Sequence, residues 1–533
     1  MNHPLAIDFG TTNTVIARWD DRASCATTLT LPGLSVGAPN DPAASVPSLV
    51  YVQDGQAGHA VTGQAVRDGA LDRRRDNRLF RNFKRGIAAT PAPDPRLIDG
   101  VQWTDRDAGR AFLGSLLDAM PDAMADVDPL VLTAPVVAFE NYLVWLSDAM
   151  GGIAPEKIRI VDESTAAALG YAVTEPNAAV LVFDFGGGTL DVSLVQLPDS
   201  REKTGGFLDR LRRTAHEQPT ARVIAKAGRV LGGSDMDRWL LAEVLRRAGL
   251  TLDDLGGGEA MLLTMCEQAK IALSTVEATP VSFEVNGAAH EVCVTRAELE
   301  ALLEHNGFYA ALRHLIDGVL HVAQRRGIFR EDIAAVLLVG GVTLMPSVRR
   351  LLGQTFGDMT VRADKPFTAV AEGALQLALG FGLDDYLAHS YGLRHLDPET
   401  GRHAYEEIIP MGSRCPTHKP FEIILCAAHD GQREIEFVVG EIAADDVSAI
   451  DVKYEDGQAV FVAKSDQDNR RIQPLDEAGA ARVLARLDPP GVPGEDRLKA
   501  AFRVDDQRRL RVTVIDLKTR RELLRDAVMA TLR

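Results

Sequence analysis

Two stretches that lie far apart in the sequence share one pattern, and this repeat constrains the fold more than any other feature. Residues 5–19 and residues 181–196 each read as an apolar strand, the tripeptide Asp-Phe-Gly, a turn of small residues and a second β-rich run. Each stretch predicts a β-hairpin. Chance produces a repeated tripeptide more readily than the same strand–turn–strand frame around both copies. The repeat therefore indicates two lobes of similar plan, each beginning with a hairpin.

The two predicted turns have the composition of phosphate-binding loops. The first is Gly10-Thr11-Thr12-Asn13 and the second is Gly186-Gly187-Gly188-Thr189. Glycines let backbone N–H groups approach a phosphate without side chains in the way, and the threonine hydroxyls add donors. An ordinary tight hairpin turn would explain either loop alone. It explains less readily a pair of loops that each follow an aspartate at the end of a strand.

These aspartates are candidates for binding a metal ion. Asp8 ends the first strand and Asp184 ends the second, and either carboxylate could hold a hydrated Mg²⁺ ion or orient a water. Asp191, two residues beyond the second turn, could assist.

The rest of the first 380 residues alternates between strand and helix patterns, which predicts α/β lobes. Residues 259–275 have an apolar stripe at helical spacing, and a separate face carries Glu267, Lys270 and Ser274. Residues 334–352 read as a strand, the turn Gly340-Gly341 and a helix. From about residue 392 onward β patterns separated by polar turns dominate, which predicts a β-sandwich-like domain after a linker at 384–391.

Composition and charge exclude several classes of protein. The 533 residues are 46% apolar and 25% charged, as expected for a globular protein, and the net charge of −17 argues against nucleic-acid binding. Five scattered cysteines without a CxxC pair indicate a reducing, cytoplasmic setting rather than disulfides or zinc. The N-terminus lacks the pattern of a secretory signal, and no apolar stretch approaches the roughly 18 residues of a membrane span. We therefore expect no membrane association.

Other phosphate-handling motifs are absent. The sequence has no GxxxxGK[ST] loop, no GxGxxG fingerprint, and no kinase catalytic loop to accompany its Asp-Phe-Gly tripeptides. GxSxG and HExxH are also missing. These absences favour a two-lobed clamp that holds a nucleotide between paired hairpins.

Four motifs, in this order along the chain, resemble those of the DnaK-type 70-kDa heat-shock chaperones of the actin-like ATPase superfamily. They are IDFGTTN at residues 7–13, ESTAAALGY at 163–171, VFDFGGGTLD at 182–191 and VGGVTLMP at 339–346. The resemblance is strong over about residues 5–382 and weaker beyond. It implies a nucleotide-binding ATPase domain at 1–383 with duplicated ribonuclease H-like lobes, lobe I at about 1–180 and lobe II at about 181–383. It also implies a β-sandwich that binds substrate or a partner at 392–533. Because the sequence stops at Arg533 after the last strand pattern, we expect the family's helical lid to be absent.

The resemblance also implies roles for individual residues. Lys84 is similar to the family's catalytic lysine, although one extra residue separates it from Phe80; without the resemblance, a surface lysine would be the simpler interpretation. Glu163 and Asp184 are expected to organise Mg²⁺ and water, and Thr189 to contact the γ-phosphate. The metal ion would be held by Asp8 and Asp184 through waters. The remaining nucleotide-binding residues would be Gly10, Thr11, Thr12, Asn13, Gly186, Gly187, Gly188, Asp191, Gly232, Gly233, Glu267, Lys270, Ser274, Gly340 and Gly341.

The sequence departs from the family pattern at three informative positions. Leu344 and Ile271 stand where family members often carry an arginine against the adenine, so stacking by a guanidinium plane is missing. Leu143 replaces the usual arginine partner of Pro135, which alters the expected signalling between the domains.

The resemblance implies slow, Mg²⁺-dependent ATP hydrolysis coupled to the binding of extended polypeptide by the β domain. A J-domain co-chaperone and a nucleotide exchange factor are the partners it suggests. The replacement of the usual arginine partner of Pro135 by Leu143 and the missing lid favour an alternative. In it, the chain is a nucleotide-gated adaptor that binds one dedicated partner and has weak or no ATPase activity. A metabolite kinase or a filament-forming actin relative fits less well, because of the motif at 163–171 and the C-terminal β domain.

Overall fold

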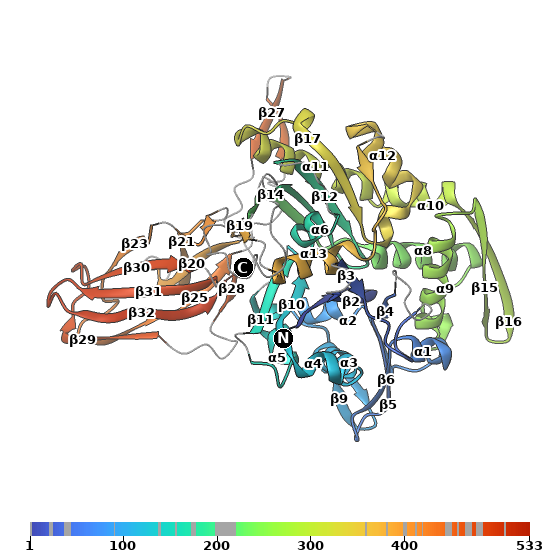
Figure 1. Ribbon diagram of the computed structural model, residues 1–533, viewed down its shortest axis with the longest axis horizontal. Helices are drawn as coiled ribbons and strands as arrows, with labels where there is room; N and C mark the ends of the chain where they lie inside the picture. The colour runs from blue at the N-terminus through green and yellow to red at the C-terminus, as the bar shows by residue number, and fades with distance from the viewer. Residues whose placement is uncertain are drawn as a thin grey trace. The chain divides into compact units, whose positions relative to one another are not determined.

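The computed structural model describes most of the chain, in which mixed α and β structure forms two compact units (Figure 1). The N-terminal unit comprises Met1–Ala138 and Trp145–Leu383, and the C-terminal unit comprises Phe139–Val144 and Asp384–Arg533. The residues described are 3–20, 25–36, 44–89, 91–136, 140–154, 157–171, 177–197, 220–357, 360–379, 382–387, 389–397, 402–410, 413–417, 419–442, 450–455, 458–463, 472–475, 483–505 and 508–532.

The first large sheet of the N-terminal unit contains the first predicted hairpin. Its strands are β1 (His3–Phe9), β2 (Asn13–Asp20), β3 (Cys25–Thr28), β10 (Val127–Ala134) and β11 (Ile158–Asp162), in the order β11-β10-β1-β2-β3, with β4 (Val46–Pro47) pairing with β2. β1 and β2 are antiparallel and pair Asp8 with Val15, while β1 and β10 are parallel. The hairpin predicted from residues 5–19 is therefore confirmed.

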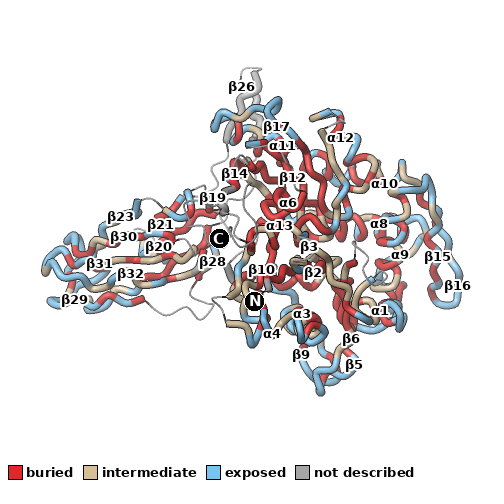
Figure 2. The backbone as a smooth tube through the Cα atoms, in the orientation of Figure 1, coloured by how far each residue is buried: buried red, intermediate tan, exposed pale blue. Residues whose placement is uncertain are grey.

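The second large sheet contains the second predicted hairpin. Its strands include β12 (Ala179–Phe185), β13 (Leu190–Gln196), β14 (Thr220–Arg229), β17 (Ile333–Val339) and β18 (Val361–Arg362), in the order β18-β17-β12-β13-β14. β12 and β13 are antiparallel, with Asp184 opposite Asp191, and β12 runs parallel to β17. All seven residues of β12 are buried, as expected for an apolar strand in the middle of a covered sheet (Figure 2).

Two helices join the two sheets through a shared core. α6 (Glu163–Gly170) packs on β12 and β13, and α13 (Ala369–Ala378) packs on β1, β2 and β10. The helices cross very closely, because a Cβ atom on Gly373 would lie 1.6 Å from the carbonyl oxygen of Ala166, and one on Gly170 would lie 1.8 Å from that of Ala369. Only glycine allows this backbone approach. One apolar cluster runs continuously from Val131 on the first sheet to Val180 and Leu337 on the second.

A second apolar core lies against the second sheet and is completed by helices. They are α8 (Gly233–Ala248), α9 (Glu259–Ala272), α10 (Arg296–His305), α11 (Phe308–Arg325) and α12 (Pro346–Phe356), together with the hairpin β15 (Ala278–Val285) and β16 (Ala288–Thr295). Pro346 occupies the first turn of α12, where its missing backbone N–H costs no hydrogen bond. The predicted helix at 259–275 ends earlier, at Ala272, where Ser274 N–H turns back to the carbonyl of Ile271.

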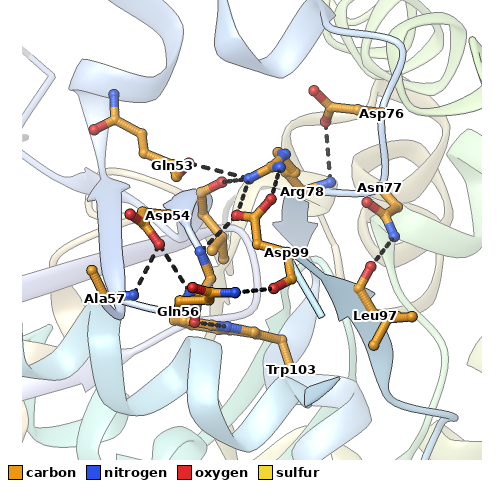
Figure 3. Close-up of polar contacts among 12 residues, drawn as sticks. Gln53, Asp54, Gln56, Ala57, Asp76, Asn77, Arg78, Leu97, Asp99 and Trp103 are labelled. Atoms are coloured by element: carbon orange, nitrogen blue, oxygen red, sulfur yellow. Dashed lines mark hydrogen bonds and ion pairs between the residues drawn. The ribbon is translucent and has the colours of Figure 1, made fainter. Parts of the chain in front are cut away.

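A smaller layer within residues 46–125 carries the segment around Lys84. It contains β5 (Leu49–Asp54), β6 (His59–Thr62), β7 (Leu79–Arg81), the hairpin β8 (Arg96–Ile98) and β9 (Val101–Trp103), and the helices α1 (Gln64–Asp68), α2 (Phe83–Ala88), α3 (Asp105–Asp118) and α4 (Pro121–Ala125). The Asp99 carboxylate at the β8–β9 turn accepts hydrogen bonds from Arg78 and from Gly55 N–H, which fixes this hairpin against β5 (Figure 3).

α5 (Glu140–Ala149) contributes residues to both compact units. Leu143, which lies on this helix, is buried. Among the described residues no helix is both long enough and apolar enough to span a membrane.

The C-terminal unit is built from antiparallel strands, and its described residues from 384 onward include no helix. Two four-stranded sheets have the orders β21-β20-β25-β28 and β23-β30-β31-β32, accompanied by the pairs β24–β29 and β26–β27. The strands are β20 (Ser390–Leu396), β21 (His403–Ile409), β22 (Arg414–Cys415), β23 (Phe421–Leu425), β24 (Gln432–Phe437), β25 (Val439–Ile442), β26 (Ile450–Glu455), β27 (Gln458–Ala463), β28 (Ile472–Pro474), β29 (Val483–Gly491), β30 (Leu498–Val504), β31 (Arg509–Asp516) and β32 (Glu522–Thr531). Of the range expected as a linker, residues 384–386 belong to β19 (Gly382–Tyr386) and residues 390–391 to β20.

This unit has an apolar core of its own and one buried ion pair. Leu498, Phe502 and Val512 are fully buried in that core. The Arg497 guanidinium lies 3.0 Å from the Asp516 carboxylate, with both side chains 1% exposed, and it also donates to the backbone carbonyl of Pro489. These further bonds offset the cost of burying the pair.

Candidate functional site

The two glycine turns predicted from the sequence face each other within the N-terminal unit. The turn that follows β1 contacts the turn that follows β12, because a Cβ atom on Gly187 would lie 2.0 Å from Thr12 Oγ1 and one on Gly188 would lie 2.5 Å from Thr11 Oγ1. Larger residues at either glycine would force the turns apart. Gly10 is equally constrained, since its Cβ would lie 2.0 Å from the carbonyl oxygen of Asn13.

Two further glycine segments converge on the second turn. Gly233 N–H donates to the Gly186 carbonyl at 3.0 Å, and Ser234 N–H donates to the Gly187 carbonyl at 2.9 Å. Gly232, which precedes them, is in backbone contact with Gly187, and Gly233 begins α8. The positive end of this helix dipole therefore lies beside the turn and favours a bound anion.

Gly340 adds the fourth segment. It has a φ of 83°, in the region that favours glycine, and a Cβ atom there would lie 2.2 Å from the carbonyl oxygen of Phe185. Gly341 follows it and is adjacent to the Phe367 ring, which is 37% exposed. The glycines named in the sequence analysis thus surround the end of β12.

Lys84 lies in the buried interior, not on the surface. It sits on α2 with 4% of its surface exposed, and its Nζ lies 2.6 Å from Glu163 Oε1. Its neighbours Phe83 and Ile87 anchor α2 in the core, which carries the lysine inward. Glu163 is the first residue of α6, so the pair connects α2 to the start of that helix.

Two strand-end aspartates share the electrostatic environment of this pair. Burial, and then the charge of Glu163, raise the pKa of Asp8 to about 7, although a hydrogen bond from Thr133 at 2.6 Å opposes the shift. The pKa of Asp184 is also raised well above its usual value, first by burial and then by the charges of Glu163, Asp8 and Asp191. Asp191 is fully buried on β13. Several carboxylates therefore compete for the positive charge of Lys84.

This donor set fits a hydrated Mg²⁺ ion. Among the described residues no three His, Cys, Asp or Glu side chains are grouped closely enough to hold a metal ion directly. Mg²⁺ retains several waters and takes few protein ligands, so two carboxylates acting through waters suit its chemistry. A divalent cation would also offset the burial and the repulsion between carboxylates that together raise the pKa values of Asp8 and Asp184.

The structure brings the three residues predicted on the helix at 259–275 only partly together at the glycine segments. Lys270 Nζ donates to the Gly233 carbonyl at 3.1 Å and lies 2.8 Å from Asp237 Oδ1. Glu267 forms an ion pair with Arg81 of β7, in which Oε2 of Glu267 lies 2.5 Å from Nη2 of Arg81. Ser274 lies beyond the end of α9, because the helix stops at Ala272.

Four charged residues near the site were not among those predicted to bind the nucleotide. Arg81 pairs with Glu267, and Arg85 pairs with Asp235 at 2.9 Å, so each arginine joins the layer around Lys84 to the helices of the second sheet. Burial raises the pKa of Asp237, the partner of Lys270, to about 6. Asp235 and Asp237 follow the predicted Gly232 and Gly233 closely in the sequence, and this proximity is the signal from which both aspartates could have been found.

Comparison with known proteins assigns the family. Residues 127–385 match the sequence model of the family described as Hsp70 protein. The chain is 30% identical over 471 residues to the chaperone protein DnaK of Thermosipho africanus, an alignment that covers 83% of this chain and 71% of the relative. It is 29% identical to the chaperone protein DnaK of Thermosipho melanesiensis, with the same coverage, and 29% identical to that of Thermotoga neapolitana, covering 82% of this chain and 70% of the relative. The chain belongs to the Hsp70 protein family.

Proposed function

We propose that the N-terminal unit binds ATP or ADP with Mg²⁺ and slowly hydrolyses ATP. The observation that carries this proposal is the buried Lys84–Glu163 pair, 2.6 Å apart, among aspartates and beside two glycine turns in contact. In this proposal the two large sheets with α6 and α13 are the lobes of an actin-like ATPase fold spanning residues 1–383. The C-terminal unit is then the β-sandwich, spanning residues 392–533.

The roles of the individual residues follow from their chemistry. The backbone N–H groups of the two glycine turns and the start of α8 bind the phosphates. Lys84 stabilises the charge that develops on the γ-phosphate, and Glu163 orients Lys84 and the attacking water. The Thr189 hydroxyl donates to the γ-phosphate. Gly340, Gly341 and α9 form the nucleoside side of the site.

Asp8 and Asp184 would hold Mg²⁺ through its waters. Mg²⁺ supplies neutralisation of the phosphate charge when it is bound. Because its positive charge favours the ionised carboxylates, both aspartates would lose the protons that their raised pKa values let them keep in the nucleotide-free protein.

The C-terminal unit is proposed to bind an extended segment of another polypeptide, with affinity set by the nucleotide in the N-terminal unit. The similarity to relatives that are chaperone proteins supports this activity. A J-domain co-chaperone and an exchange factor would then regulate the cycle.

Substitution of Lys84 tests the ATPase proposal. Lys84→Met should lower steady-state ATP turnover by roughly a hundredfold, because one charged group that acts on the transition state is removed. Lys518→Met is the matched control, since Lys518 pairs with Glu495 in the C-terminal unit with 47% of its side chain exposed. Unchanged turnover in Lys84→Met would refute the assignment of this lysine.

A nucleotide-gated adaptor for one dedicated partner is the second candidate. It is favoured by Leu143, which replaces the arginine that the family usually pairs with Pro135. Leu143 is buried, with 6% of its surface exposed. An array of apolar peptides probed with the full chain, with and without ATP, separates the two functions. Binding of many peptides that weakens with ATP supports the chaperone, and uniform absence of binding supports the adaptor.

A further inference from the structure

Behind the candidate catalytic pair lies a second set of buried polar residues to which neither the sequence nor the proposed mechanism gives a role. The set comprises Asp162, Ser164, Ser193 and Lys226. All but Lys226 are less than 9% exposed, and the Lys226 side chain is 9% exposed. Buried polar groups almost always have hydrogen-bond partners, and the partners of these four residues connect α6 with the second sheet.

Asp162 fixes the first turn of α6. Its Oδ1 accepts a hydrogen bond from Thr165 N–H at 2.8 Å and another from the Ser164 hydroxyl at 3.2 Å. This is an N-cap, which satisfies amides that have no partner within the helix. Glu163 is the next residue, so the cap fixes the position of the residue whose carboxylate pairs with Lys84.

Lys226 holds the other oxygen of the cap. Its Nζ lies 3.7 Å from Asp162 Oδ2, and the two side chains are 9% and 5% exposed. A buried carboxylate without a nearby cation is costly, and removing one partner of a buried pair leaves the other uncompensated. Lys226 lies on β14, so this pair ties the start of α6 to the second sheet.

A second contact ties α6 to the strand that leaves the glycine turn. The Ser164 and Ser193 hydroxyl oxygens are 2.6 Å apart, and Ser193 lies directly opposite Lys226 in the β13–β14 ladder. β13 begins one residue after the Gly186–Thr189 turn. The same buried residues therefore connect the start of α6, where Glu163 lies, with β13, the strand that follows the Gly186–Thr189 turn.

We propose that Lys226, through Asp162, is a positioning residue that sets the place of Glu163 relative to Lys84 and to the second glycine turn. This inference rests on the proposed ATPase function. Lys226 does not contact nucleotide in this scheme. It acts on the rate because a displacement of about 1 Å at a reacting centre costs up to roughly a hundredfold.

The test combines single variants with their double variant in the full chain. Lys226→Met keeps the length of the side chain and removes its charge, and should lower kcat for ATP about tenfold while the Kd for ADP changes less than twofold. Lys226→Arg should retain at least half of the wild-type kcat. In Asp162→Asn/Lys226→Met both charges are removed and an amide oxygen still caps α6, so most of the lost kcat should return. Arg350→Met, which breaks an exposed ion pair with Glu300 in the same unit, is the control and should leave kcat unchanged.

Hydrogen–deuterium exchange provides a readout that needs no turnover. In nucleotide-free protein, peptides covering residues 158–171 should exchange faster in Lys226→Met than in wild type, and the double variant should restore their protection. An unchanged kcat in Lys226→Met, a loss that the double variant does not reverse, or equal losses in ADP affinity and kcat would each overturn the proposal.

A wild-type chain without ATP turnover would instead refute the proposed function. The exchange of residues 158–171 would then still decide the positioning role: unchanged exchange in Lys226→Met would refute it, and faster exchange reversed in the double variant would support it.

Discussion

Replacement of Asp8 by asparagine should stabilise the nucleotide-free protein while weakening its proposed use of Mg²⁺. The substitution keeps the shape of the side chain and an oxygen that can accept the hydrogen bond from Thr133. It removes a negative charge from the neighbourhood of Glu163. The site would then be more stable and less functional, as expected where a protein holds like charges together for a ligand.

The size and sign of the effect follow from the pKa of Asp8, which is raised from 3.8 to about 7. The folded protein keeps a proton that the unfolded chain releases, so the stability of the wild type falls as the pH rises from about 4 to about 7. A shift of about three pKa units corresponds to a loss of stability of roughly 4 kcal/mol. The wild type bears this whole penalty above pH 7 and none of it below pH 4. Part of this penalty is shared with Asp184, so we expect Asp8→Asn to gain about 2–4 kcal/mol at pH 8 and almost nothing at pH 4.

The assay is urea unfolding of the full chain in EDTA without nucleotide, at several pH values between 5 and 8. The free-energy difference between Asp8→Asn and wild type should grow from pH 5 to about pH 7 and level off above that. A difference that is the same at pH 5 and pH 8, or a variant less stable than wild type at pH 8, would refute the reasoning.

Asp99 provides a control of opposite sign. A hydrogen bond from Arg78 lowers the pKa of Asp99 to about 2, so this carboxylate stabilises the fold above pH 4 and its contribution is lost only as the pH falls toward 2. Asp99→Asn should therefore destabilise the protein by an amount that does not change between pH 5 and pH 8. Figure 3 shows the bonds that this substitution would weaken.

Three further predictions concern the same unit. Binding of Mg²⁺ and ADP at pH 6.5 should release protons from Asp8 and Asp184, which titration calorimetry in buffers of different ionisation enthalpy would detect as a buffer-dependent heat; a buffer-independent heat would contradict this. Arg81→Met should speed ADP release severalfold in stopped-flow measurements, because the buried pair with Glu267 joins two layers beside the site. Gly373→Ala should destabilise the N-terminal unit by about 3 kcal/mol or more, since its Cβ would meet a backbone carbonyl at 1.6 Å, and an unchanged urea midpoint would show that the helices can separate.

The sequence was most informative where function depends on short segments. The hairpins β1–β2 and β12–β13 were predicted from an apolar strand, the tripeptide Asp-Phe-Gly, a turn of small residues and a second β-rich run, and the structure contains both. The sequence predicted that the two turns bind phosphate from paired hairpins, whereas the direct contact between the turns is known only from the structure. Lys84 was identified by resemblance alone, since nothing in its local charge pattern distinguishes a buried lysine from an exposed one.

What the sequence could not predict depends on tertiary distances. The pairs Arg81–Glu267 and Arg85–Asp235 join residues separated by 186 and 150 positions, and no local pattern records which charges will meet. Ser274 was placed on the face of Glu267 by helical spacing, but α9 ends before it. Helix ends are set by a few backbone bonds, which periodicity does not specify. In the C-terminal unit the dominance of β structure after about residue 392 was predicted, whereas the order of strands in the sheets follows from long-range pairing.

The crossing of α6 and α13 has a consequence for how this molecule tolerates change. The two helices meet through glycine and backbone atoms, so no side chain at that point can adopt another rotamer to absorb a displacement. A displacement of either helix at this point would therefore disturb the apolar core that the two sheets share. The addition of a single carbon atom at Gly170 or Gly373 would thus be felt in both sheets at once.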